Sequence, residues 1–589
     1  MKSYKILGLL LLTSTQFYAQ KKDENIGTEV VNIVKPYTPT ISDAFKAKEV
    51  PVLEDEVNTQ KEEINYSIFS FPVASTFTPA KGVAANVDPA EKQKYFQNYV
   101  RLGAGNYGTI DGEADLTYNL DRTNYLALFV NHRSSRGGID DVKFDDKYSH
   151  SAIKGYYGSK SNELDWKIGL GYNRDMYNWY GTSPTYFDLI YPINASSFDV
   201  KNVYSTIVLD GQAKMNDGVL DNGNFFFKRF TDKKDSQENH FHIKPTASFE
   251  VNGFDIQADV VVDYLGGSFA RGYNQLTMPA EQKYSYFNVG LQPRLRYVAD
   301  ALNLQAGLGV FYSMGKNNDE SNNNFYIFPQ IKASYTIVDG VLMAFAGAEG
   351  NLQQNSFASL IDKNPFLSPT QFIKPTSNLY DVYLGLNGKL SSKISFNLKG
   401  SYKQQNDYTF FVLNALNNPM YPDTGVQAYE LGNSYGVVYD DLKTMSFSGE
   451  IKYDITKDSN VGFSGEFNSF TTDQQEAWHL PTFKIGADAN FKITNKWFAG
   501  ANLFFVGERY GLENYVLTSD INGAITTSSN KVTLDSYFDV NAKVLYKHND
   551  RISGFLKLNN IAGQNYMRFT NYPVQGFQVL VGASYNFDF

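Results

Sequence analysis

The chain has 589 residues, of which 42% are hydrophobic and 15% aromatic, with a formal net charge of −9 and no cysteine. The lack of cysteine excludes disulfides, thiolate metal sites and a lipid-modified cysteine anchor, and the mild acidity argues against a nucleic-acid partner. Many Tyr and Phe residues at moderate overall hydrophobicity favour numerous half-buried strands over one thick soluble core.

The first residues are typical of a secretory signal. Lys2 and Lys5 precede the apolar run 6–12, and the small residue Ala19 stands before Gln20 at a plausible cleavage point. We therefore expect residues 1–19 to be a signal peptide and the protein to be exported. No later stretch approaches the ~18 apolar residues of a spanning helix, so a membrane form would have to be a closed barrel.

Residues 20–97 carry six prolines and several charge runs. Proline interrupts both helices and central strands, so this stretch predicts an extended periplasmic or lumenal segment. It precedes the first expected strand, which begins near Asn98.

From Asn98 onward, apolar and polar residues alternate in runs of nine or more. In Phe483–Ile493 every odd position is apolar, and Phe538–Tyr546 shows the same period on its even positions. A period of two over this length is typical of tilted membrane strands. The G-x-G-x-x-G pattern at 103–108 lies inside such a run, without the strand–helix context that a dinucleotide site needs, so we expect wall glycines there.

The connections between these runs alternate in length. Ten short turns would join twenty strands in pairs, and one further strand at each end gives about 22, the pattern of an outer-membrane β-barrel. The short turns are expected at 121–124, 160–163, 216–222, 252–253, 299–301, 339–340, 391–393, 457–460, 494–495 and 548–551. The long loops are expected at 173–199, 267–283, 353–376, 406–434 and 507–531.

The chain ends in GFQVLVGASYNFDF, whose odd positions from Phe577 to Phe589 are all apolar. This face should meet lipid, while the even positions line the lumen and the strand pairs with the first one to close the barrel. The pattern Tyr585-x-Phe587-x-Phe589 resembles the C-terminal signal that the outer-membrane barrel assembly machinery recognises.

Over residues 98–589, the strand number, the terminal Phe and the loop asymmetry resemble the barrel of TonB-dependent receptors of the Bacteroidota type. That family places a folded plug before the barrel, whereas residues 20–97 are too short and too broken for one, so we expect at most a reduced plug. The stretch Glu29-Val30-Val31-Asn32-Ile33-Val34 is similar to the box that pairs with TonB by strand addition. An extended stretch packed at the periplasmic mouth is the alternative.

Three other groups of residues are candidate sites. His240 and His242 share the lumenal face of one run, but two imidazoles without a third ligand favour polar wall lining over a metal site. Asp140, Asp141, Asp145 and Asp146 lack the ligand order of a calcium loop and favour a solvated loop. Tyr177, Trp179 and Tyr180 either contact a ligand such as a sugar or siderophore, or form part of an interfacial aromatic girdle; the girdle is the preferred reading.

No G-x-S-x-G or H-E-x-x-H motif is present, so we expect neither an enzyme nor a bound cofactor. We expect an all-β transmembrane barrel in the outer membrane that passes a small polar solute or ligand. Its partners would be lipid, the assembly machinery and TonB or another envelope protein. The alternatives are a structural or assembly subunit with a blocked lumen, and a passive porin without a plug.

Overall fold

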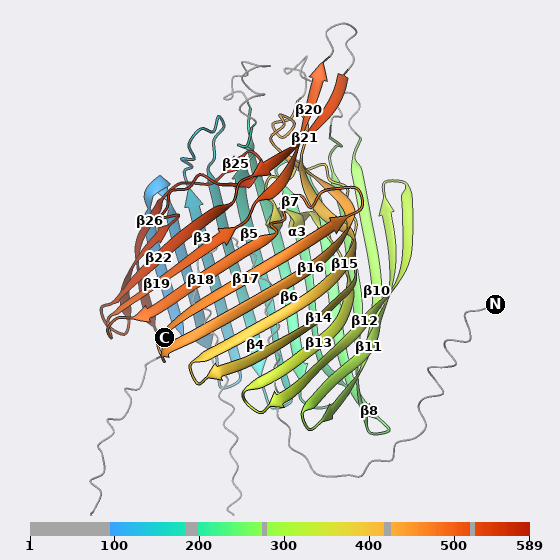
Figure 1. Cartoon of the computed structure of the whole chain (residues 1–589), viewed down its shortest axis with the longest axis vertical. Coiled ribbons are helices and arrows are strands. Elements are labelled where there is room, and N and C mark those ends of the chain that lie inside the picture. The colour runs from blue at the N-terminus through green and yellow to red at the C-terminus, as the bar shows by residue number, and fades with distance from the viewer. Residues whose placement is uncertain (1–94, 183–197, 274–279, 417–425, 519–524) are drawn as a thin grey trace, which may run out of the picture. The chain divides into compact units, whose positions relative to one another are not determined.

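The computed structural model describes residues 95–182, 198–273, 280–416, 426–518 and 525–589. The expected signal peptide and most of the segment 20–97 lie outside the described residues. The described chain is dominated by one antiparallel sheet of 22 strands (Figure 1). This confirms the fold class and the strand number that alternation and turns predict.

The wall strands follow one another around the sheet in chain order. The first eleven are β1 (Asn98–Gly105), β2 (Ile110–Asn119), β3 (Asn124–Ser135), β4 (Tyr148–Lys160), β5 (Leu164–Asn178), β6 (Lys201–Met215), β7 (Leu220–Asp232), β8 (Gln237–Val251), β9 (Phe254–Phe269), β10 (Gln282–Ala299) and β11 (Leu302–Asn317). The other eleven are β12 (Glu320–Val338), β13 (Leu342–Gln353), β14 (Thr376–Ser391), β15 (Ile394–Leu413), β16 (Tyr435–Thr456), β17 (Ser459–Thr472), β18 (Phe483–Lys492), β19 (Trp497–Val506), β22 (Tyr537–Lys547), β23 (Ile552–Asn559) and β26 (Gln578–Phe587).

The sheet closes on itself because β26 pairs with β1 as well as with β23. The closing register runs from Asn98 opposite Phe587 to Gly105 opposite Leu580. The last strand ends at Phe587 rather than at Phe589, and the Asp588 carboxylate accepts a hydrogen bond from the backbone N–H of Gln97 at 2.9 Å. No edge strand of the wall is therefore left unpaired.

All ten predicted short turns are confirmed, since each joins two consecutive wall strands at one end of the barrel. The opposite end, called the loop side below, departs from the prediction in two ways. Three of its connections, at 106–109, 233–236 and 318–319, are short. The expected loop 507–531 instead contains most of a hairpin, β20 (Arg509–Thr518) with β21 (Ile525–Leu534), that projects beyond the wall (Figure 1).

Four further elements belong to the connections. A 3₁₀ turn, η1 (Asn106–Gly108), joins β1 to β2, and a short helix, α3 (Phe357–Lys363), lies in the connection 354–375. The strands β24 (Met567–Phe569) and β25 (Tyr572–Pro573) pair within the connection 560–577, which sequence patterns do not single out as a long loop.

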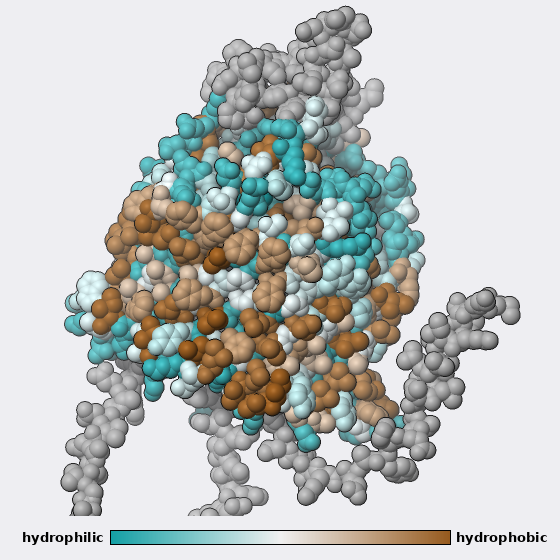
Figure 2. Space-filling view, in the orientation of Figure 1, coloured by the Kyte–Doolittle hydropathy of each residue, from teal (hydrophilic) through white to brown (hydrophobic). Residues whose placement is uncertain are grey.

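Alternation sorts the side chains between the two faces of the wall. Outward positions carry large apolar residues, among them Leu170, Leu384 and Val581, each more than half exposed. Figure 2 shows such residues gathered over the wall, with hydrophilic residues at the loop side. An apolar surface of this extent around a closed barrel faces lipid. Within the described residues, no helix is long and apolar enough to cross a membrane.

Candidate functional site: the polar lumen and its loop-side mouth

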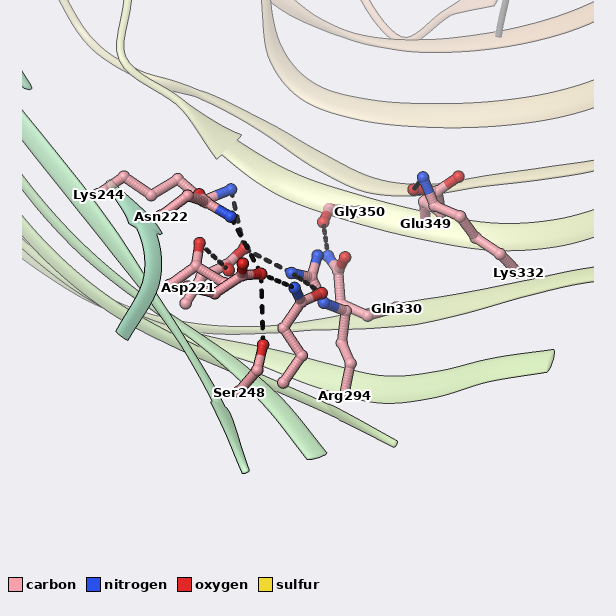
Figure 3. Close-up of polar contacts among 12 residues, drawn as sticks. Asp221, Asn222, Lys244, Ser248, Arg294, Gln330, Lys332, Glu349 and Gly350 are labelled. Carbon is pink, nitrogen blue, oxygen red and sulfur yellow. Dashed lines mark hydrogen bonds and ion pairs between the residues drawn. The ribbon is translucent and has the colours of Figure 1, made fainter. Parts of the chain in front are cut away.

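The inward positions of β8, β9 and β10 carry charges that are paired with one another. The Asp259 carboxylate lies 2.8 Å from the Arg294 guanidinium and 2.9 Å from the Lys244 ammonium, and it accepts a hydrogen bond from Thr246. Arg294 also donates to Gln257 at 3.2 Å. Figure 3 shows these contacts converging from several strands. Because Asp259 is only 2% exposed, loss of a partner would leave a buried charge uncompensated.

The network extends through Gln257 to Asp221 on β7, and a separate ion pair lies on β12 and β13. Asp221 accepts hydrogen bonds from Asn222 and Ser248, and Lys332 on β12 pairs with Glu349 on β13 at 2.7 Å (Figure 3). Pairs of opposite charge on neighbouring strands fix the side chains and limit the net field in the lumen. A wall of this kind can offer many hydrogen bonds to a polar solute.

A second paired cluster lies at the closing seam. The Arg101 guanidinium lies 3.0 Å from Asp111 and 3.2 Å from Glu113, and the Lys557 ammonium lies 3.7 Å from Asp111. These residues come from β1, β2 and β23, so the cluster joins the first strands to the last ones. The lumenal side of the seam is therefore as polar as the rest of the wall.

His240 and His242 share the lumenal face of β8, as their alternation predicts, and both bond to one carboxylate oxygen of Asp263 at 3.0 and 2.9 Å. The ring of Phe226 packs against both imidazoles. Among the described residues, no group of three or more His, Asp or Glu side chains is arranged to hold a metal ion. The pair is thus part of the wall network.

At the loop side, the connection 354–375 turns inward and crosses the mouth. Its helix α3 starts with a capping box between Ser356 and Ser359. The carboxylate of Glu238, on β8, accepts hydrogen bonds from the backbone N–H groups of Phe357 at 2.7 Å and Ala358 at 3.2 Å. A buried carboxylate at this place satisfies two of the unpaired donors at a helix N-terminus.

The rest of this connection is held largely through its main chain. The Trp179 indole N–H donates to the carbonyl of Leu367 at 3.3 Å, and the Tyr204 hydroxyl donates to that of Pro365 at 2.9 Å. Leu367 also forms a parallel bridge with Tyr435 at the start of β16. Donors from β6 and the end of β5 thus hold a segment that begins after β13.

Aromatic and aliphatic side chains from several connections pack together around this segment, and we call them the loop cluster. Phe366 stacks on Tyr572 at 3.7 Å between ring centroids, and Trp179 packs edge-on against Tyr429 at 5.5 Å. The mouth is therefore filled by a small apolar core. Its buried members are Phe144, Trp179, Val200, Tyr204, Phe230, Leu265, Phe269, Tyr284, Phe357, Leu360, Ile361, Phe366, Leu367, Ile373, Leu413, Ala428, Tyr429, Leu431, Tyr435, Phe569 and Tyr572.

The three loop aromatics singled out in the sequence belong to this core. Trp179 is 1% exposed, and Tyr177 and Tyr180 pack against the cluster, with Tyr180 at 4.8 Å from Tyr572 between ring centroids. Burial raises the pKa of the Tyr180 hydroxyl above its ordinary value. In this closed arrangement Trp179 reaches neither lipid nor external solvent, which corrects the girdle interpretation for that residue.

His479, on the connection 473–482, borders the loop cluster. Its ring packs against Tyr435 and Phe569, and its Nε2 lies 3.2 Å from the Thr570 hydroxyl and accepts from the Thr570 N–H at 3.4 Å. Desolvation, and next the Arg509 charge, lower the pKa of His479 to about 3. The closed mouth therefore holds this imidazole in its neutral form at physiological pH.

The remaining sequence candidates fall in different places. Tyr585 faces outward and is 42% exposed, whereas Phe589 lies beyond the last strand, 75% exposed and edge-on to Tyr118. Asp146 accepts hydrogen bonds from the backbone N–H groups of Gly138 and Ile139, so it organises its own loop. The segment Glu29–Val34 lies outside the described residues.

Sequence reasoning located the connection 353–376 but not its role. One local signal could have suggested more: Ser356 stands before Phe357, Leu360 and Ile361, whose spacing is that of one helix face, which predicts a helix start. Nothing local marks Glu238 or Tyr204 as its anchors, because they lie far away along the chain.

Comparison with known proteins identifies structures with a similar fold. No family model matches the chain, and no curated protein matches its sequence. The ferripyoverdine receptor of the outer membrane of Pseudomonas aeruginosa has a TM-score of 0.59 at 14% identity, over 84% of this chain and 72% of that one. The likeness is one of fold.

Two further solved structures agree. The copper transporter OprC has a TM-score of 0.57 at 13% identity, over 84% of this chain and 82% of that one. The siderophore receptor PirA from Acinetobacter baumannii has a TM-score of 0.58 at 11% identity, over 84% and 81% respectively. The barrel fold is thus similar to that of these receptors and of this transporter.

Proposed function

We propose that the protein is an outer-membrane receptor that takes up a polar solute or ligand through its barrel. The observation that carries this proposal is the inner wall, where paired charges such as Asp259 with Arg294 and Lys332 with Glu349 line the inside of a closed 22-stranded barrel. A lumen lined in this way offers hydrogen bonds along a path through the membrane. The fold shared with siderophore receptors and a copper transporter supports the same class of function.

The proposed mechanism has two steps. The solute is first captured at the loop side, where opening of the loop cluster would bring Tyr177, Trp179 and Tyr180 within reach of it. It then passes along the polar wall. In this proposal the connection 354–375 is the barrier, because it crosses the mouth and is anchored to β6 and β8.

Energy for opening would come from the inner membrane if the N-terminal segment engages TonB. The residues proposed for this contact are Glu29, Val30, Val31, Asn32, Ile33 and Val34, whose extended apolar pattern suits strand addition. We further propose that residues 1–19 are a signal peptide, that residues 20–97 form a reduced plug, and that Tyr585, Phe587 and Phe589 are recognised by the barrel assembly machinery.

A second candidate function is a structural or assembly subunit of an envelope complex. The filled mouth favours it, since a core with Trp179, Leu360 and Tyr435 almost fully buried resembles a permanent closure. A passive porin without a plug is the third possibility, and an open lumen would be its mark.

Single-channel conductance in a planar bilayer tests these functions. We would compare the intact protein, a form without residues 20–85, and Glu238→Ala, which removes the anchor of α3. If Glu238→Ala conducts and the intact protein does not, the connection 354–375 is a movable barrier and the receptor gains support. If only the truncation conducts, the N-terminal segment is the barrier. Steady conductance of the intact protein means a porin, and silence of all three supports the structural subunit.

A further inference from the structure

The outer face of the wall carries a basic, acid-free group of residues on the loop-side half of β5 to β8. We call it the collar, and it consists of Arg174, Ser205, Arg229, Thr231, Gln237 and Asn239. Cross-strand register places them in two neighbouring rows. Arg174, Ser205, Thr231 and Gln237 follow one another in the first row, and Arg229 pairs with Asn239 in the second.

The collar ends abruptly at an apolar row on its short-turn side. Phe227 stands on β7 two positions below Arg229. It is opposite Phe241, and Phe241 is opposite Tyr264 on β9. These rings point outward and are 38%, 36% and 43% exposed. Aromatic residues of this kind mark the boundary between hydrocarbon and headgroups. The collar therefore sits at headgroup level in the loop-side leaflet.

The positive charge of the collar is not compensated within the described chain. Arg229 donates to the neutral side chains of Asn239 and Gln237, each at 3.0 Å. Arg174 is exposed, and among the described residues no carboxylate forms an ion pair with it or with Arg229. One strand, β6, lies between the strands of these arginines, so their backbones are two strand spacings, about 10 Å, apart across the sheet and one row apart along it. An anion from outside the chain would give both guanidinium groups a partner of opposite charge.

A hollow lies on the same wall on the short-turn side of Arg174, with the outward Tyr172 between them, and its lining extends to Tyr118 and Phe589 near the short-turn end. It has a volume of about 570 Å³ and an apolar lining that includes Leu128, Gly155, Leu170 and Leu209. Gly155 creates the depth, because a Cβ at that position would meet only the Ala127 carbonyl oxygen, at 3.9 Å. Leu170 is opposite both Gly155 and Leu209. The hollow thus continues the outward face of β5 below the collar.

We propose that the collar and the hollow together bind one phosphorylated membrane lipid of the loop-side leaflet. Arg174 and Arg229 hold the phosphate oxygens, which suit the forked donors of a guanidinium. The hydroxyl and amide groups of the collar bind the polar headgroup, and an acyl chain fills the hollow in front of Gly155. This site is separate from the lumen, so it does not depend on the transport proposal.

The test uses the full chain in detergent and native mass spectrometry, with phosphatidylglycerol as the lipid probe. Arg174→Gln with Arg229→Gln should weaken retention of the lipid about tenfold or more, since charge-assisted hydrogen bonds are lost. The matched control is Arg122→Gln, an exposed arginine in the turn 120–123 at the opposite end. Retention equal to that of the unaltered protein in the double variant would overturn the proposal.

Two further arms separate the sources of the phosphate and examine the hollow. Gly155→Leu should weaken retention, whereas Gly465→Leu, an outward glycine with nothing within 4 Å of its added Cβ, should not. Equal effects of these two variants on lipid retention would contradict the binding of an acyl chain in the hollow. Inorganic phosphate at the same concentration should fail to displace the lipid. Displacement would mean that the collar takes free phosphate, which would overturn the lipid assignment.

Discussion

Adjacent side chains on one strand of this barrel face different media, so single substitutions can be matched closely. On β17, Phe463 points outward and is 57% exposed, while its neighbour Ser464 points into the lumen opposite Glu450. The two positions share the same depth and the same local backbone. A difference in stability between the same substitution at the two positions therefore reflects the medium that each side chain faces.

Phe463→Arg should therefore destabilise the barrel by up to about 2–4 kcal/mol, the cost of an arginine at the bilayer midplane, because the charge would enter hydrocarbon. Ser464→Arg should cost much less, since it enters a polar lumen and gains an acidic neighbour. Denaturant unfolding in lipid vesicles measures both, with Phe463→Ala as the control for lost ring contacts. Equal costs for the two arginines would contradict the assignment of the faces.

His479 makes the stability of the closed mouth depend on pH. Its folded pKa of about 3 lies below the ordinary 6.5, so the unfolded or opened state binds a proton more readily. Stability of the closed mouth is then complete above pH 6.5 and is lost as the pH falls toward 3. At pH 5 the loss should be on the order of 1–2 kcal/mol.

His479→Asn should flatten this dependence between pH 7.5 and 5, measured as the thermal midpoint of unfolding. Asn is suitable because residue 479 has a φ of 61°, a conformation that Asn tolerates, and because it does not titrate. His548→Asn, on the exposed turn 548–551, is the control that should leave the slope unchanged. An unaltered slope in His479→Asn would assign the pH response to other groups.

At the level of elements, the wall strands and the connection 354–375 differ in what the sequence reveals. A strand can be predicted from the alternation of its own residues, and a short turn from its own residue types, so both signals are local in the sequence. The position of α3 depends instead on contacts such as Trp179 with Leu367, 188 residues apart. Such pairs leave no periodic pattern in the sequence, so a loop could be predicted there, but not its path across the mouth.

Glu238→Ala should loosen α3, because it leaves the N–H groups of Phe357 and Ala358 without an acceptor, at about 1–3 kcal/mol each. Faster limited proteolysis within 354–375 is the expected result. Glu250→Ala, at the short-turn end of the same strand, should not change the rate. Unchanged proteolysis in Glu238→Ala would show that the apolar packing alone holds the helix.

For the whole molecule, closure depends on close approach at the seam between β1 and β26. A Cβ on Gly582 would lie 2.3 Å from the carbonyl oxygen of Leu102, and one on Gly105 would lie 2.2 Å from that of Val579. These contacts account for Gly105 in the pattern 103–108. Gly103 also lies on the wall, as expected, whereas Gly108 lies in the turn η1 at a φ of 61°, so the expected wall position is wrong for it. The partner strand could be predicted from barrel closure, but the tightness of the seam could not.

Gly582→Val should prevent normal closure, since the clash involves backbone rather than a flexible side chain. The expected result is a marked loss of the heat-resistant folded form on a gel. Gly400→Val, where nothing lies within 4 Å of the added Cβ, should fold normally. Normal folding of Gly582→Val would mean that the two strands can separate without cost.

The connection 354–375 is held by its apolar side chains in the loop cluster and by its main chain, through the N–H groups of Phe357 and Ala358 and the carbonyls of Pro365 and Leu367. Main-chain groups are the same for almost every amino acid, so the hold tolerates change in the loop's own exposed charges, Asp362 and Lys363. The chemistry that a solute would meet could thus drift over generations while the segment keeps its place. New specificity would then require no redesign of the barrel.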